Sequence, residues 1–130
     1  MEEFEKLENL KKYISDNRLR EKAENVEHDI EAEVYFLTPE EGGRHTPAII
    51  GYRPNHLMNG DYLTSGMHIY LDQDYVFPGH IARTGITFIS PEHYPHCLEV
   101  GMKIRVQEAS RLVGYAKVTK IFNKLLEKLT

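Results

Sequence analysis

The sequence contains a single cysteine, Cys97, and no apolar run near the ~18 residues that a membrane-spanning helix requires. One cysteine cannot form an internal disulfide bond. The N-terminus, Met-Glu-Glu-Phe-Glu-Lys, is acidic and lacks the apolar segment of a signal peptide. These absences predict a cytoplasmic protein in a reducing compartment, without contact with a membrane.

Motifs for nucleotide binding and catalysis are also absent. There is no Gly-x-x-x-x-Gly-Lys-[Ser/Thr] motif, and no lysine follows any of the nine glycines. A phosphate-binding loop needs that lysine beside clustered backbone N–H groups, so we expect no bound nucleotide. No nucleophile lies in a Gly-x-Ser-x-Gly turn, and no Ser-His-Asp or Cys-His pairing can be argued. We therefore expect no enzymatic activity and no cofactor.

The length and charge indicate one domain that is not built as a general nucleic-acid binder. A chain of 130 residues is long enough for a single hydrophobic core. Sixteen Lys and Arg residues against 20 Asp and Glu residues give a net charge of −4, whereas nucleic-acid-binding domains are typically basic. The net charge does not exclude local basic patches, but long-range attraction of RNA is not expected.

The N-terminal part has the pattern of helices. Residues 2–27 contain neither glycine nor proline, and apolar side chains recur at helical spacing. This stripe consists of Phe4, Leu7, Leu10, Ile14, Leu19, Ala23 and Val26. The polar residues 15–17 can end one helix and cap another, which leaves one helix or two open. We expect the apolar stripe to dock on the rest of the domain.

From residue 30 the apolar pattern changes to a period of two, which is typical of strands. The expected strands cover residues 30–36, 48–52, 62–71, 81–89, 102–107 and 112–121. Gly-, Pro- and Asp-rich segments separate them, and many short strands of this kind indicate an antiparallel barrel or sandwich. Residues 122–129 return to helical spacing. We therefore expect a helical extension at 1–29, a β domain at 30–121 and a short helical tail at 122–130.

Several motifs within the β domain occur in the order of a known family. Residues 31–37, Glu-Ala-Glu-Val-Tyr-Phe-Leu, precede Glu-Glu-Gly-Gly-Arg-His-Thr-Pro at 40–47 and Gly-Tyr-Arg-Pro at 51–54. Further motifs are Phe-Pro-Gly at 77–79, Phe-Ile-Ser-Pro at 88–91, Ile-Arg-Val-Gln-Glu at 104–108 and Arg-Leu-Val-Gly at 111–114. Over about residues 30–121 the chain resembles the C-terminal, third domain of bacterial translation elongation factor Tu. The resemblance implies an all-β fold, a six-stranded antiparallel Greek-key barrel, present as a stand-alone copy without the GTPase domain.

The resemblance also implies a set of binding residues. In that family the barrel contacts the T-stem backbone of aminoacyl-tRNA and packs on protein partners. The positions carried over are Arg44, His45, Arg53, Asn55 (in place of the usual Gln), Arg83 and Glu108. Ala109 and Ser110 replace the family's Gly-Gly after Glu108, and alanine is less suited to close phosphate approach or a positive φ. The tRNA site is thus partly kept and partly lost.

Three functional hypotheses follow from these observations. The first is a non-catalytic module that binds a protein partner of the translation machinery or mimics the factor. The second is direct RNA binding, with tRNA as a candidate, through the basic loops of the barrel. The third is a small metal-binding protein, because His93, His96 and Cys97 could supply ligands to zinc or copper. Their spacing matches no standard metal motif and a fourth ligand is not obvious, so a solvated loop is the favoured interpretation.

Overall fold

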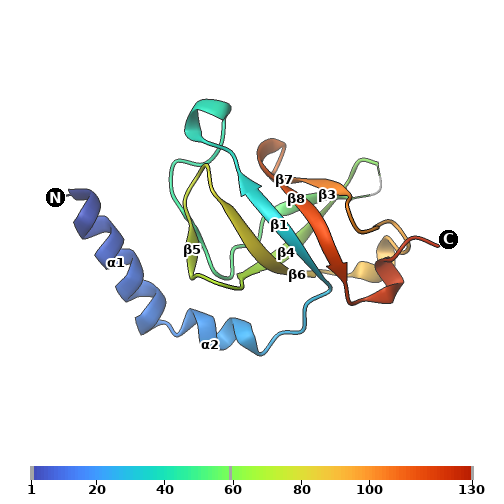
Figure 1. The fold of residues 1–130 in the computed structure, drawn as a ribbon, viewed down its shortest axis with the longest axis horizontal. Coiled ribbons are helices and arrows are strands. Elements are labelled where there is room, and N and C mark those ends of the chain that lie inside the picture. Colours follow the sequence, from blue (N-terminus) through green and yellow to red (C-terminus); the bar gives the residue numbers. More distant parts are fainter. Residues whose placement is uncertain (1, 59, 130) are drawn as a thin grey trace.

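The fold was analysed in a computed structural model that describes residues 2–58 and 60–129, with the backbone alone at residues 2–4. Two helices are followed by eight strands and three short 3-10 helices (Figure 1). The helices are α1 (Glu2–Asp16) and α2 (Leu19–Glu24). The strands are β1 (Ile30–Phe36), β2 (Ala48–Ile49), β3 (Asn55–Met58), β4 (Tyr62–Tyr70), β5 (Tyr75–Val76), β6 (Ile81–Phe88), β7 (Lys103–Glu108) and β8 (Arg111–Ile121). The 3-10 helices are η1 (Pro39–Glu41), η2 (Pro91–His93) and η3 (Lys124–Leu126).

Six antiparallel strands close into a barrel in the order β1-β6-β4-β3-β7-β8. Strands β3, β4 and β6 follow one another in the chain and are neighbours in the barrel. Strand β1, which precedes them in the chain, lies beside β6 and not beside β3, which is a Greek-key arrangement. Strand β1 pairs with β6 on one side and with β8 on the other. Closure leaves no free strand edge in the barrel. The predicted all-β Greek-key barrel is confirmed.

The barrel interior is filled by alternate side chains of each strand. In β1 the inward positions Ile30, Ala32, Val34 and Phe36 are buried, whereas Glu33 is exposed. This alternation is the period-two pattern expected of a strand with one face on the core. Burial of such apolar side chains contributes roughly 1.5–3 kcal/mol each, so the barrel carries its own core.

Two histidines lie inside this core. His56 and His68 are both fully buried, and their Nε2 atoms are 2.9 Å apart, so one imidazole donates a hydrogen bond to the other. The Nδ1 atom of His68 lies 3.2 Å from the hydroxyl of Tyr70. Burial lowers the pKa of His56 to about 4 and lowers that of His68 well below its usual value. The pair is therefore neutral at pH 7 and acts as part of the packed interior.

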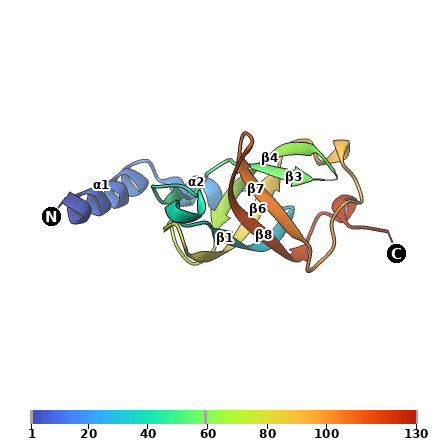
Figure 2. The same ribbon diagram turned by 90° about the horizontal axis from the view of Figure 1, so that it is seen from above.

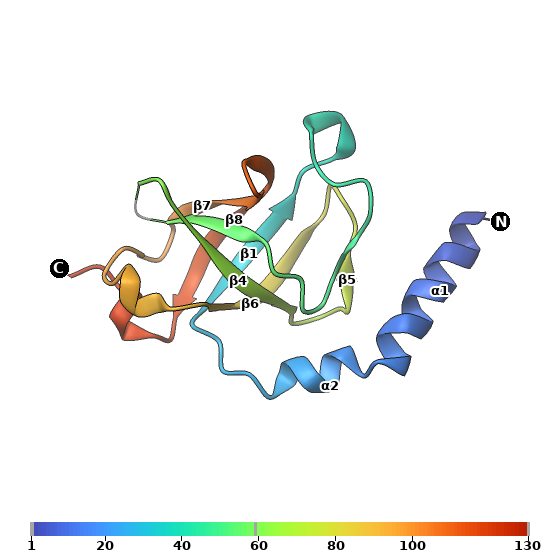
Figure 3. The ribbon, with the colours of Figure 1, turned by 180° about the vertical axis from the view of Figure 1, so that it is seen from behind.

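Two helices precede the barrel, and α2 is the one that lies against it (Figures 2 and 3). The helical structure is interrupted between them at Arg18, which has a left-handed φ of 51°. Arg20 in α2 hydrogen-bonds Asp74 and the carbonyl oxygens of Tyr70 and Gln73. Among the described residues, no helix is long and apolar enough to cross a membrane.

The apolar stripe of the helices docks on the barrel only in part. Ile14 is 4% exposed and Ala23 is 5% exposed, and Leu10, Leu19 and Val26 pack against the same core. Leu7, one turn nearer the N-terminus, is only partly buried, and the side chain of Phe4 lies outside the described residues. The expected docking is therefore strongest at α2 and the end of α1, and it weakens toward the N-terminus.

Three segments differ from the expected secondary structure. The segment predicted as a strand at 48–52 forms only the two-residue β2, which pairs with β5 outside the barrel. The barrel instead uses β3, whose short polar sequence Asn-His-Leu-Met gave no strand signal. At the C-terminus the expected helix is a single 3-10 turn, η3, because Glu127 then forms a bridge with Leu98.

The partial docking of α1 gives a first prediction. Replacing Ile14 by alanine should lower the free energy of unfolding by about 2–4 kcal/mol, because it leaves a cavity in the hydrophobic cluster to which Ile14 belongs. Leu7→Ala, on the same helix, should cost less than about 1 kcal/mol because Leu7 is only partly buried. Urea denaturation followed by circular dichroism measures both. Equal losses for the two variants would contradict the docking described.

The histidine pair predicts a pH dependence of stability. In the unfolded chain both imidazoles bind a proton near pH 6.5, whereas His56 in the folded chain binds one only near pH 4. Between these values the unfolded state holds more protons, so the free energy of unfolding should fall as the pH is lowered, by about 1.4 kcal/mol per pH unit for each histidine. Above about pH 7.5 it should be constant with respect to these groups.

A double variant isolates this contribution. His56→Phe with His68→Phe keeps two rings in the core and removes both titrating groups, so the slope between pH 6.5 and 4 should flatten relative to the wild type. Chemical denaturation across this range measures it. An unchanged slope would assign the acid sensitivity to other groups.

Candidate functional site

The loop that carries Arg44 is shaped by the two glycines before it. Gly42 has a φ of 95°, in the left-handed region that glycine adopts without cost. A Cβ at Gly43 would lie 2.2 Å from the carbonyl oxygen of Leu37, so no larger residue fits there. Arg111 donates hydrogen bonds to the carbonyl oxygens of both glycines. The Gly-Gly pair thus has a structural role, and the loop places Arg44 against the barrel.

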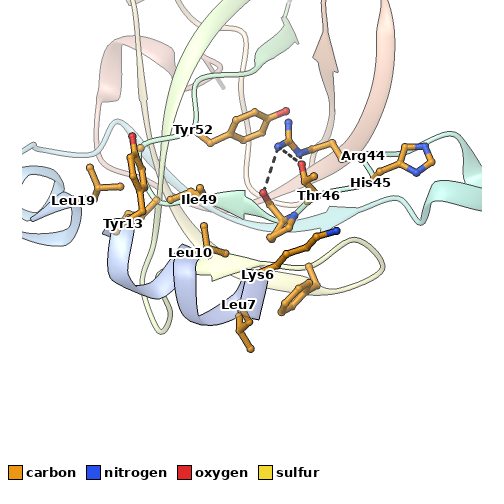
Figure 4. Close-up of a pocket in the computed structure, with 14 residues that line it drawn as sticks. Lys6, Leu7, Leu10, Tyr13, Leu19, Arg44, His45, Thr46, Ile49 and Tyr52 are labelled. Atoms are coloured by element: carbon orange, nitrogen blue, oxygen red, sulfur yellow. Dashed lines mark hydrogen bonds between the residues drawn. The ribbon is translucent and has the colours of Figure 1, made fainter. Parts of the chain in front are cut away.

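Arg44 forms an ion pair with Glu108, 64 residues away at the end of β7. The hydroxyl of Tyr52 donates a hydrogen bond to the same Glu108 carboxylate, and the Arg44 guanidinium lies 4.6 Å from the centre of the Tyr52 ring. Arg44 also donates to the Thr46 hydroxyl at 3.2 Å (Figure 4). We call Arg44, Tyr52 and Glu108 the Arg44 cluster.

The electrostatics of the Arg44 cluster favour the charged pair. Partial burial by itself would lower the pKa of Arg44, but the nearby Tyr52 and Glu108 raise it. Partial burial would raise the pKa of Glu108, yet hydrogen bonds from Tyr52 and Arg44 lower it. The pKa of Tyr52 is raised by burial and by its bond to Glu108. At neutral pH the cluster holds one positive and one negative charge, so Arg44 brings little net charge to the surface.

Tyr52 joins the Arg44 cluster to the buried core. Its ring lies 6.1 Å from that of Phe36 and 5.7 Å from that of His68, at 90° to the latter. Edge-to-face contacts of this kind add stabilisation beyond buried area alone. Tyr52 therefore connects the cluster to Phe36 and His68 of the core.

A groove opens beside the Arg44 cluster, between α1 and the segment 44–52 (Figure 4). Its volume is about 1130 Å³. Leu7, Leu10 and Tyr13 of α1 line one wall, and Ile49 and Phe77 line the other. Lys6, Arg44 and His45 also line it. The groove is thus mainly apolar and carries basic groups.

The remaining predicted site residues are spread around the barrel. His45 is exposed next to the groove, and Asn55 pairs in register with Gln107, the neighbour of Glu108. Arg53 is exposed and lines a second hollow of about 440 Å³ beside α2. Arg83 lies on β6, which β4 and β3 separate from β7 in the barrel order, and it pairs with Asp72 at 3.2 Å. The structure therefore gathers Arg44, His45, Asn55 and Glu108 on one side and leaves Arg83 apart.

The metal hypothesis finds no support in the described part of the chain. Within residues 2–58 and 60–129, no group of three His, Cys, Asp or Glu side chains is placed to hold a metal ion. The Nδ1 atom of His96 lies 3.0 Å from the carbonyl oxygen of Glu127, and Cys97 is buried. His93, His96 and Cys97 thus form no three-ligand site.

Residue patterns did not indicate the groove. Its walls come from α1, the segment 44–52 and Phe77, which are distant in sequence and meet only in the fold. One signal was present: the exposed Tyr13 lies beside the apolar stripe of α1 and widens it. Tyr52 was visible within Gly-Tyr-Arg-Pro, but nothing in the sequence indicated that it bonds Glu108.

The Arg44 cluster predicts that Arg44 and Glu108 are coupled in stability. Arg44→Ala should lower the free energy of unfolding by about 1–2 kcal/mol, because it leaves a partly buried carboxylate without its cation. Adding Glu108→Gln to Arg44→Ala should cost less than the sum of the single effects. Arg53→Ala is the control and should change little, since Arg53 is exposed. Strictly additive losses in urea titrations would contradict the coupling.

A comparison of the sequence with models of protein families gives one match. The family described as "Elongation factor Tu C-terminal domain" matches residues 24–122. The match includes all six strands of the barrel and all six predicted site residues. Since it covers well over half of the 130 residues, and the closed barrel has the predicted topology, the chain belongs to the elongation factor Tu C-terminal domain family.

Proposed function

We propose that this chain is a non-catalytic binding module that holds a protein partner of the translation machinery in the groove between α1 and the segment 44–52. The observation that carries the proposal is the groove itself, an open space of about 1130 Å³ with mainly apolar walls. Its family supports a role in translation, because the matched domain is that of a translation elongation factor.

The walls of the groove keep large apolar side chains in contact with water. Tyr13 is 54% exposed and Phe77 is 41% exposed, from opposite walls. Aromatic side chains that face a hollow are typical anchors of protein interfaces, and contiguous exposed apolar surface is uncommon in monomers without a binding role. A partner that filled the groove would cover both rings.

The polar groups of the groove indicate the chemistry of the partner segment. Lys6 and His45 contribute basic groups, and Lys6 has no ion pair among the described residues. Arg44 is largely neutralised by Glu108. The groove therefore fits an amphipathic segment with an apolar face and acidic residues that can approach Lys6.

The way in which α1 is attached fits this role. Helix α1 is held at its C-terminal end by Ile14, whereas Leu7 is only partly buried. One wall is thus the segment 44–52 with Phe77, and the other is a helix attached mainly at its C-terminal end. Such a pair of walls can close on a bound segment with little cost in barrel structure.

RNA binding through the positions carried over from the family is less well supported. Arg44 pairs with Glu108, and Arg83 pairs with Asp72. These two arginines also lie on different sides of the barrel, and the chain has a net charge of −4. Two neutralised and separated arginines offer little to a phosphate backbone.

The experiment is an affinity capture with groove variants. Immobilised chain is incubated with a ribosome-containing extract treated with ribonuclease, and the captured proteins are identified and then purified for titration. Tyr13→Asp with Phe77→Asp should weaken binding of a captured translation component at least thirtyfold, since loss of an interface anchor costs about 2 kcal/mol or more.

A matched control uses exposed apolar side chains elsewhere. Val100 is 61% exposed and Phe122 is 51% exposed, and neither lines the groove. Val100→Asp with Phe122→Asp makes the same change of charge and hydrophobicity and should leave binding intact. Equal loss of binding in both double variants would contradict the proposal. So would a partner that is captured from untreated extract but not from extract treated with ribonuclease, because RNA would then form the link.

A further inference from the structure

The β7–β8 hairpin concentrates positive charge in an otherwise acidic chain. Residues 103–121 contain five Lys and Arg residues and one acidic residue, Glu108, whereas the whole chain has a net charge of −4. Glu108 is already paired with Arg44. The hairpin is thus strongly basic in a molecule whose other parts are acidic.

The strand register places four of these bases on the outer surface. Lys103 lies directly opposite Lys117, and Arg105 lies opposite Tyr115. Lys103, Arg105, Lys117 and Lys120 are exposed, while the residues that alternate with them, such as Ile104 and Ala116, are buried. We call Lys103, Arg105, Lys117 and Lys120 the basic face.

The basic face contains one like-charge pair across the two strands of the hairpin. Like charges directly opposite each other on neighbouring strands are destabilising, and Lys103 and Lys117 occupy such positions. None of the ion pairs among the described residues involves a member of the basic face. An anion bound between the two strands would relieve this repulsion.

The surroundings limit the face on one side and place an aromatic ring at its centre. On β1, Glu33 lies opposite Lys117 and Glu31 lies opposite Lys120, so negative charge begins at the next strand. The Lys103 ammonium lies 5.1 Å from the centre of the Tyr115 ring, on the same surface. A long anion would therefore cross β7 and β8 and avoid β1.

From this arrangement we infer that the basic face is a second binding site, which takes the phosphate backbone of RNA. Neighbouring strands are about 4.8 Å apart and alternate residues of a strand about 6.6 Å apart, so Lys103, Arg105 and Lys117 form a compact array for successive phosphates. Lys120, three residues after Lys117, extends the array along β8. The site shares no residue with Arg44, His45, Arg53, Asn55, Arg83 and Glu108, or with the groove. It is independent of the proposed function, so one chain could hold RNA and a protein together.

The test measures binding of a fluorescein-labelled RNA hairpin by anisotropy at several salt concentrations. Wild-type chain should bind saturably, with affinity falling as salt rises. Lys103→Gln with Lys117→Gln should weaken binding roughly tenfold at low salt and make the salt dependence shallower by about 1–2 units of log K per log salt. The melting temperature of this variant should be equal or higher, because the like-charge contact is removed.

Two controls separate this site from its alternatives. Lys11→Gln with Lys12→Gln removes the same charge from exposed positions on α1 and should leave RNA affinity nearly unchanged. In the groove variant Tyr13→Asp with Phe77→Asp, replacing Lys103 and Lys117 should weaken RNA binding as much as it does in the wild type. The two proposals can therefore fail independently of each other. No saturable binding, equal losses in both lysine variants, or tighter binding of a polyglutamate peptide than of RNA would overturn the inference.

Discussion

The structure depends on the closure of the barrel by its first strand. Strand β1 pairs along its length with both β6 and β8, so backbone hydrogen bonds run around the whole ring. Asp29, immediately before β1, accepts hydrogen bonds from the backbone of Phe88 and from the side chain of Asn123. The helices, the end of β6 and the C-terminal turn thus meet at the start of β1. The basic face lies on two strands of this ring, and the groove lies beside it.

The sequence contained most of the fold because strands with one buried face have a visible period. The alternation in β1, and the short β-like runs between turn-rich segments for β4, β6, β7 and β8, placed these strands within two residues of their ends. Strand β3 was missed because it is short and one of its two interior positions is occupied by His56, a polar residue whose hydrogen-bond partner, His68, is twelve residues away. The C-terminal helix was predicted longer than it is. Leu126 is buried at the end of a single 3-10 turn, next to the Glu127–Leu98 bridge, and the spacing of apolar residues alone does not distinguish this from the buried face of a helix.

Much less of the candidate site could be predicted, for reasons of geometry. Arg44 and Glu108 were each identified as binding residues, but their mutual ion pair bridges 64 residues and appears only when the β7–β8 hairpin folds against the loop. The basic face was hidden for a related reason. Lys103 and Lys117 become neighbours through the register of the hairpin, and the bulge between Val106 and Gln107 shifts that register. The composition of residues 103–121 gives their positive net charge, but it does not show that four of the basic side chains lie on the outer surface.

The pairing of β1 with β8 also determines when the protein can fold during its synthesis. Strand β1 leaves the ribosome before both of its partners, and β8 follows β6. Until β8 emerges, a strand with four apolar side chains keeps at least one unpaired edge. Contacts between distant segments also slow folding. The nascent chain is therefore vulnerable to aggregation at β1, and chaperone protection is valuable in the interval before translation reaches β8.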